Sequence, residues 1–146
     1  MKLKTILVAV NGNKADVEVI KLACDLAKKS KACIYAVYVV EVKRSLPLDA
    51  AIDSEMKKAE DVLTQAEEIA GERSCELKAD IVQARDVGPA IVEEAVEREA
   101  DLIIIGLTQK RKFGNFSLGN VIPHVLKEAP CRVLLSREPI PEVITV

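Results

Sequence analysis

Runs of apolar residues alternate regularly with amphipathic segments along this chain. Five runs rich in Val, Ile, Leu and Ala predict strands at Thr5–Val10, Ala32–Val40, Ala79–Ala84, Leu102–Ile105 and Cys131–Leu135. The first, fourth and fifth are nearly continuous in apolar residues, which is typical of parallel strands buried on both faces. The third is shorter and partly polar, which indicates the edge of a sheet.

The segments between these strands repeat their apolar residues at helical spacing, which predicts four helices. The first covers Lys14–Lys29. The second begins near Ile52, with Asp53 or Ser54 placed to cap its first turn and Gly71 placed to end it.

The third helix begins at Gly88-Pro89 and extends to about Arg98. The fourth begins near Gly119, and its apolar face is predicted from Leu118, Val121, Ile122, Val125 and Leu126. Strict alternation of strands and helices implies a parallel sheet with right-handed crossovers and helices on both faces. The predicted fold class is therefore a single-domain, Rossmann-like α/β fold with five strands. Their order in the sheet stays open at this point.

Composition excludes several classes of protein. The chain has 146 residues, the length of one domain, with 21 basic and 23 acidic residues and 3% aromatic residues. It has neither the basic excess nor the stacking platforms expected of a nucleic-acid-binding protein. No apolar window reaches the length of a membrane span, and the apolar start is too short for a signal peptide. We therefore predict a cytoplasmic protein without nucleic-acid or membrane partners.

Neither the cysteines nor the other reactive side chains assemble into a catalytic or metal site. The four cysteines form no CxxC pair and are interpreted as small buried hydrophobic residues in a reducing compartment: Cys24, Cys33, Cys75 and Cys131. His124, the only histidine, has no carboxylate or cysteine at ligand spacing and is interpreted as a helix-surface residue. The sequence therefore predicts no enzyme, and a weak ATP hydrolase is a minor alternative.

The stretch between the fourth and fifth strands carries the main candidate chemistry. Gly106 ends the predicted strand, a polar and basic loop follows, and Gly119 and Asn120 open the next helix. Glycines let backbone amides approach a ligand, and a helix N-terminus offers unpaired N–H groups. This arrangement predicts a phosphate site. The alternative is that the two glycines only end a strand and open a helix.

This stretch resembles the C-terminal half of the universal stress protein family, whose nucleotide-binding members carry Gly-x2-Gly-x9-Gly-Ser/Thr. Gly106 and Gly119 occupy the first and third glycine positions, whereas Gln109 and Asn120 replace the second glycine and the Ser/Thr. The resemblance covers the rest of the chain and implies the strand order 3-2-1-4-5. That order brings the first and fourth strands together, and ligands bind beyond the carboxyl ends of strands at such a point.

The resemblance also implies where ATP, with or without magnesium, would bind. The nucleoside would contact Asn11, where nucleotide-binding relatives usually have an aspartate, with Ala9 and Val10 beside it. Adenine would lie against the end of the second strand, at Val39 and Val40. For each of the four apolar residues the alternative is an ordinary place in the core.

The phosphates would meet the loop and the start of the fourth helix. Within the basic run 110–112, Arg111 could neutralise them with its fork of donors, unless this run is only a solvated loop tip. The predicted nucleotide-binding residues of this part are Gly106, Gln109, Arg111, Gly119, Asn120, Val121 and Ile122.

The family domain is predicted to cover residues 1–138, followed by a C-terminal tail at 139–146. By resemblance, the tail and the strand Cys131–Leu135 would form the seam of a homodimer; a tail folded back on its own domain is the alternative. The predicted function is a nucleotide-responsive, ATP-binding regulator of the stress response, acting on an unknown protein. The alternative is a family member without ATP that acts as a dimeric interaction module.

Overall fold

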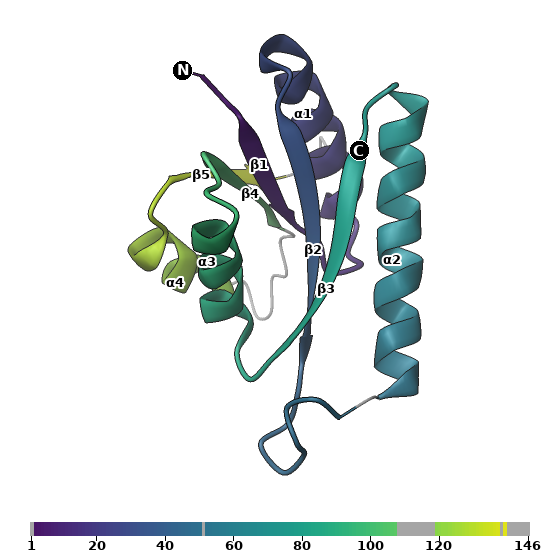
Figure 1. Cartoon of the computed structure of the whole chain (residues 1–146), viewed down its shortest axis with the longest axis vertical. Helices are drawn as coiled ribbons and strands as arrows, with labels where there is room; N and C mark the ends of the chain where they lie inside the picture. Colours follow the sequence, from purple (N-terminus) through teal and green to yellow (C-terminus); the bar gives the residue numbers. More distant parts are fainter. Residues whose placement is uncertain (1, 51, 108–118, 138, 140–146) are drawn as a thin grey trace, which may run out of the picture.

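The computed structural model describes residues 2–50, 52–107, 119–137 and 139 (Figure 1). Its strands are β1 (Thr5–Ala9), β2 (Cys33–Glu41), β3 (Leu77–Ala84), β4 (Leu102–Leu107) and β5 (Arg132–Arg137). Its helices are α1 (Ala15–Ser30), α2 (Asp53–Glu72), α3 (Val87–Glu97) and α4 (Val121–Glu128). The predicted alternation of strands and helices is confirmed.

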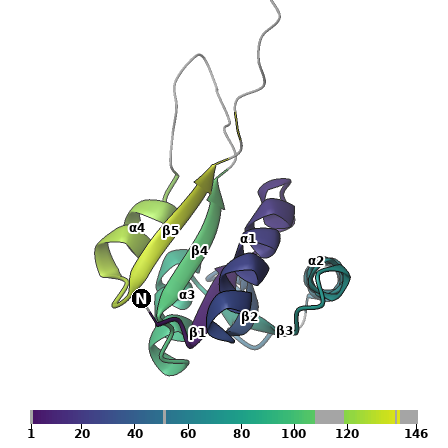
Figure 2. The same ribbon diagram turned by 90° about the horizontal axis from the view of Figure 1, so that it is seen from above.

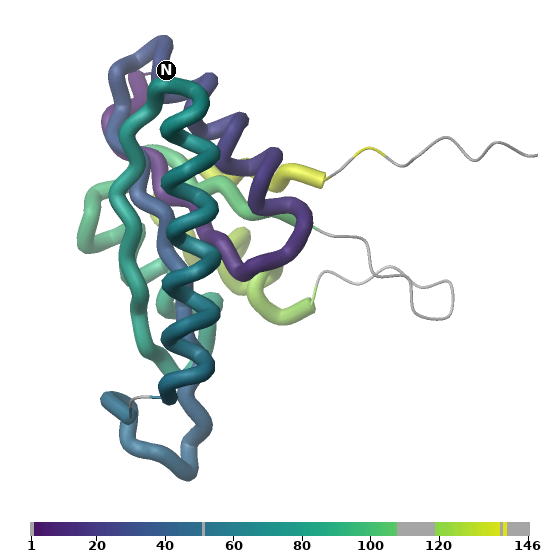
Figure 3. The backbone as a smooth tube through the Cα atoms, turned by 90° about the vertical axis from the view of Figure 1, so that its right-hand side faces the viewer, coloured from purple at the N-terminus to yellow at the C-terminus, as the bar shows by residue number. Residues whose placement is uncertain are grey.

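The five strands form one parallel sheet in the order β3-β2-β1-β4-β5, as predicted. Chain order reverses at β1, with β2 and β3 on one side of it and β4 and β5 on the other. Helices α1 and α2 cover one face of the sheet, and α3 and α4 cover the other (Figures 1 and 2). In the side view, α2 lies in front of the sheet as the outermost helix on this side (Figure 3). Among the described residues, no helix has the length and apolar character of a membrane span.

Side chains of β1 alternate between the two faces of the sheet and build two hydrophobic clusters. On the α1–α2 side, Ile6 and Val8 pack with Ile20. On the α3–α4 side, Leu7 packs with residues including Ile103. All five are at most 1% exposed, and burial of each such side chain stabilises the fold by roughly 1.5–3 kcal/mol. This places β1 at the centre of the fold.

Helix α2 differs from the prediction at both ends. Its N-cap residue is Ile52, without a side-chain cap, so Asp53 and Ser54 lie inside the helix and the predicted capping is wrong. Gly71 also lies inside the helix, which ends one residue later at Glu72, with Arg73 as its C-cap. The predicted apolar stripe is confirmed at its buried positions Ala59, Leu63, Ala66 and Ala70.

Three predictions of burial are wrong, and each concerns a residue at the margin of the fold. Strand β5 forms an edge of the sheet, and its Leu134 is 36% exposed, whereas burial on both faces was predicted. Leu126 on the short helix α4 is 49% exposed. Cys33 begins β2 at an exposed position, and of the four free cysteines only Cys24 is fully buried. The edge position predicted for β3 is confirmed.

Helix α1 packs directly onto β4 at Gly106. A Cβ at this position would lie 2.6 Å from the Cβ of Ala15 and 2.9 Å from Cγ2 of Val19. Strand β4 also continues through Gly106 to Leu107, beyond its predicted end at Ile105. The glycine therefore serves close packing between a helix and a strand.

Asp101 joins the amino ends of β1 and β4. Its Oδ2 accepts hydrogen bonds from the backbone N–H groups of Lys4 (2.7 Å) and Thr5 (3.0 Å). Its own N–H donates to the carbonyl oxygen of Thr5 at 2.9 Å. The two backbone donors lower the pKa of the Asp101 carboxyl below its usual range.

Gly106→Ala is expected to lower the free energy of unfolding by about 1–3 kcal/mol, because the added methyl group forces α1 and β4 apart. The matched control is Gly71→Ala, where an added Cβ meets nothing within 4 Å. Helix propensity predicts a gain of up to about 1 kcal/mol there. Urea unfolding followed by circular dichroism measures both, and equal effects would contradict the packing role of Gly106.

Asp101→Ala is expected to lower the free energy of unfolding by about 1–2 kcal/mol near neutral pH, because two backbone donors lose a charged acceptor. Since the folded-state pKa is lowered, this stabilisation is present above the unfolded-state pKa of about 4 and is lost as the pH falls through the folded-state value. Denaturant titrations across this range should show the variant and the native protein converging. The exposed loop variant Asp49→Ala is the control. A pH-independent difference would contradict the role of Asp101.

Candidate functional site

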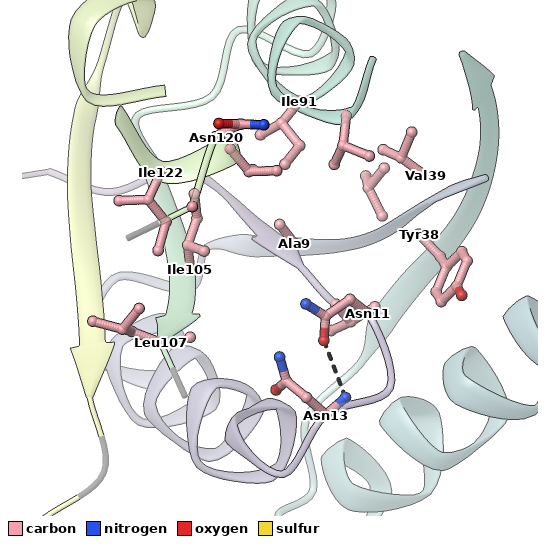
Figure 4. Close-up of a pocket in the computed structure, with 16 residues that line it drawn as sticks. Ala9, Asn11, Asn13, Tyr38, Val39, Ile91, Ile105, Leu107, Asn120 and Ile122 are labelled. Carbon is pink, nitrogen blue, oxygen red and sulfur yellow. Dashed lines mark hydrogen bonds between the residues drawn. The ribbon is translucent and has the colours of Figure 1, made fainter. Parts of the chain in front are cut away.

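A cavity of about 390 Å³ opens at the carboxyl ends of β1, β2 and β4 (Figure 4). Its walls come from these strand ends, the β1–α1 loop, the first half of α3 and the start of α4. It therefore lies where chain order reverses in the sheet, at the point where parallel α/β proteins bind their ligands. This volume lies in the range of small-molecule sites.

The cavity forms because β1 leaves the sheet before β2 ends. Pairing of β1 with β2 stops at Ala9 and Val37, and the Val10 N–H still donates to the Val37 carbonyl oxygen at 3.1 Å. Strand β2 continues to Glu41 beside β3. Alternate residues of a strand direct their backbone groups to opposite neighbours, so Val39 directs its N–H and C=O to the side that β1 has left. These two groups face the cavity.

Asp16 holds the turn from β1 into α1. Among the described residues it is the one buried charged side chain, at 8% exposed. Its carboxylate accepts the N–H groups of Gly12 (2.7 Å) and Asn11 (3.3 Å). Burial raises the pKa of the Asp16 carboxyl, and these two hydrogen bonds offset part of that rise. Gly12 has a φ of +89°, which allows the chain to turn away from the sheet here.

Two asparagines of the β1–α1 loop lie beside the cavity (Figure 4). The Asn11 Oδ1 accepts the backbone N–H of Asn13 at 3.0 Å. The Asn13 Oδ1 accepts the backbone N–H of Ala15 at 2.9 Å and so caps the start of α1. Both amide oxygens are therefore used inside the loop.

The opposite side of the cavity is formed by the start of α4. Gly119 has a φ of +68°, and a Cβ there would meet none of the described residues within 4 Å, so backbone conformation favours glycine at this position. Asn120, the N-cap residue, makes no side-chain capping hydrogen bond. The first N–H groups of a helix have no partner within the helix, so this side can receive hydrogen-bond acceptors.

Most residues predicted to bind nucleotide line this cavity, namely Ala9, Val10, Asn11, Val39, Gly106, Gly119, Asn120, Val121 and Ile122. Val40 does not. It is 1% exposed and packs in the cluster under α1 and α2, because successive side chains of β2 point to opposite faces. Gln109 and Arg111 lie outside the described residues.

The prediction from sequence missed Asn13 and most of the apolar wall of the cavity. Asn13 carried a detectable signal, since it belongs to an Asn-Gly-Asn turn directly after a strand. The apolar residues carried none, because a cavity wall and a core position share the same pattern. They are Val37, Tyr38, Val87, Ile91, Ile105 and Leu107.

The described lining of the cavity has no charged side chain. Within the described part of the chain, no group of three or more His, Cys, Asp or Glu residues could hold a metal ion. His124 packs against Gly88, where an added Cβ would come within 3.1 Å of it, and lies outside the cavity. The site can therefore enclose an apolar ring and supply hydrogen-bond donors, without an evident nucleophile or metal.

The model of the Universal stress protein family matches residues 2–137 of this chain. The universal stress protein MJ0531 of Methanocaldococcus jannaschii is 32% identical over 142 residues, which cover 93% of this chain and 83% of that protein. The match to the family model extends through the strand ends and the glycine-bearing segment described above.

Solved structures agree with the fold. The universal stress protein of Archaeoglobus fulgidus in complex with dAMP has a TM-score of 0.73 and 22% identity, covering 92% of this chain and 98% of its own. An Arabidopsis thaliana family protein with AMP bound has a TM-score of 0.67 and 16% identity, covering 97% of each chain. With a family model spanning nearly the whole chain and a relative above 30% identity, this chain belongs to the universal stress protein family.

Proposed function

We propose that this chain is a nucleotide-responsive regulatory protein of the stress response that binds an adenine nucleotide in the cavity. One observation carries the proposal. Because β1 ends early, the edge of β2 at Val39 and the N-terminus of α4 line the same cavity. The complexes named above, one with dAMP and one with AMP, support the choice of adenine.

Adenine suits the end of β2. Its edge carries a ring nitrogen acceptor next to an exocyclic amine donor. The N–H and C=O of Val39 are the complementary pair, and both point to the side that β1 has left. Ile91 and Ile105 add apolar walls for the faces of the ring. This assigns the base to Val39 and leaves Asn11, which follows the central strand β1, for the sugar.

The phosphates would then reach Gly119 and Asn120 at the start of α4. The proposed roles of Gln109 and Arg111 in neutralising them rest on the sequence pattern. No described carboxylate lines the cavity, so the residues present do not fit a resident magnesium ion. In our proposal magnesium arrives only as a partner of ATP, held by its phosphates.

Nucleotide binding would act by shifting the population of two conformations around the cavity, which requires that the nucleotide bind one of them more tightly. We do not propose that the chain hydrolyses the nucleotide. Asp16, whose carboxylate holds the β1–α1 loop, is buried and engaged with backbone donors. The regulated protein is unknown, and a cytoplasmic location stays a prediction.

Isothermal titration with AMP, ADP and ATP, with and without magnesium, tests the proposal. Ala9→Leu should weaken binding by about tenfold or more, because the larger side chain occupies the cavity (Figure 4). Ala79→Leu, on the exposed edge strand β3, is the matched control and should bind normally. Thermal unfolding verifies that both variants fold. No binding at millimolar ATP with magnesium would contradict the proposal.

A second candidate function, a dimeric interaction module without nucleotide, is favoured by β5. Only one side of β5 is paired within the described sheet, and Leu134 projects from it 36% exposed. A strand edge without a partner, beside an exposed apolar side chain, is suited to pairing with a second copy of the chain. We therefore keep the proposed homodimer through β5, to which the tail at 139–146 would add.

Leu134→Lys is expected to convert a dimer into a monomer, because it places a charge at the proposed seam. Val96→Lys is the control, since Val96 is a more exposed apolar residue, at 56%, on α3. Size-exclusion chromatography with light scattering measures the mass of each. A native monomer, or equal dissociation by both substitutions, would argue against β5 as the seam.

A further inference from the structure

We propose that the side chains of the β1–α1 loop turn their hydrogen-bond donors, and not their oxygen atoms, toward the ligand's sugar, so that the site does not require free sugar hydroxyl groups. The residues concerned are Asn11 and Asn13. The inference rests on the proposed function and specifies which sugar chemistry the site accepts.

The orientation of both amides is set by the backbone. Asn11 Oδ1 lies 3.0 Å from the N–H nitrogen of Asn13, and Asn13 Oδ1 lies 2.9 Å from that of Ala15. Rotating either amide by half a turn would set an NH₂ donor against an N–H donor. Each oxygen is therefore held on the side of the loop backbone, and the two NH₂ groups are the polar atoms turned toward a ligand. Figure 4 shows both nitrogens on the cavity side of the loop.

The one carboxylate of this region cannot act as the missing acceptor. Asp16 is 8% exposed, and its oxygens accept the N–H groups of Gly12 and Asn11. Its buried negative charge also disfavours a phosphate at this edge of the cavity, because like charges in a low-dielectric setting repel strongly. A neutral sugar is therefore the part of a nucleotide that suits this position.

Donor-only recognition has a consequence for ligand choice. An NH₂ group can donate to the oxygen of a hydroxyl, an ether or a phosphate ester equally, whereas a carboxylate needs a hydroxyl hydrogen. The site is thus expected to accept adenine nucleotides whose 2′ or 3′ oxygen is alkylated or esterified. An aspartate at position 11 would reverse this, because its second oxygen would face the sugar as an acceptor.

Titration calorimetry with AMP and with its 2′-O-methyl and 3′-O-methyl derivatives tests the inference. Native protein is expected to bind all three within about threefold. Asn11→Asp keeps an oxygen for the Asn13 N–H, and it should bind each analogue that loses a contacted hydroxyl about tenfold more weakly than AMP. Comparing the two proteins with the same ligands cancels the steric effect of the methyl group. Thermal unfolding verifies the fold of the variant.

Gln65→Glu, which adds the same carboxylate at an exposed position of α2 away from the cavity, is the matched control, and its preference among the three ligands should equal that of native protein. Equal preference in native protein and Asn11→Asp would overturn the inference, as would a native protein that rejects both analogues while the variant accepts them. If AMP itself does not bind native protein, the proposed function fails first, and this inference fails with it.

Discussion

The cavity depends on one buried interaction, the carboxylate of Asp16 with the backbone of Asn11 and Gly12. After Val10 the chain leaves β1, and Asp16 accepts the N–H groups of Asn11 and Gly12 while the chain turns into α1. Burying a carboxylate is costly unless donors surround it, and the raised pKa of Asp16 reflects that cost. The same interaction ends the central strand early, which leaves the edge of Val39 open.

Two glycines that share one sequence pattern act for different physical reasons. Gly106 lacks a Cβ because Ala15 and Val19 of α1 lie against it. Gly119 has a positive φ, and none of the described residues would lie within 4 Å of a Cβ placed there. The first thus fixes how close α1 lies to β4, and with it the position of the β1–α1 loop opposite the end of β4. The second shapes the entry into α4. Part of a pattern associated with phosphate binding is therefore explained by packing.

Membership of the family agrees with the fold, and the polar groups around the cavity are amides. Its described lining is neutral, with amides from Asn11, Asn13 and Asn120. Recognition would therefore rely on backbone groups and amide donors more than on ion pairs. Neutral donors discriminate among ligands by hydrogen-bond pattern, which is why the orientation of two amides can decide the accepted sugar chemistry.

Periodicity in the sequence determined the alternation of strands and helices, the fold class and the edge position of β3, because spacing along one element is a local property. It could not determine that β5 is also an edge, or that Leu134 stays exposed, because both depend on which strands lie alongside. The order of strands was implied by resemblance and confirmed by the pairing. The same implied order placed Asn11 and Gly106 at one crevice, and both line the cavity. Only the tertiary structure separated Val39 from its neighbour Val40 and added the apolar wall, since both depend on contacts between residues far apart in the chain.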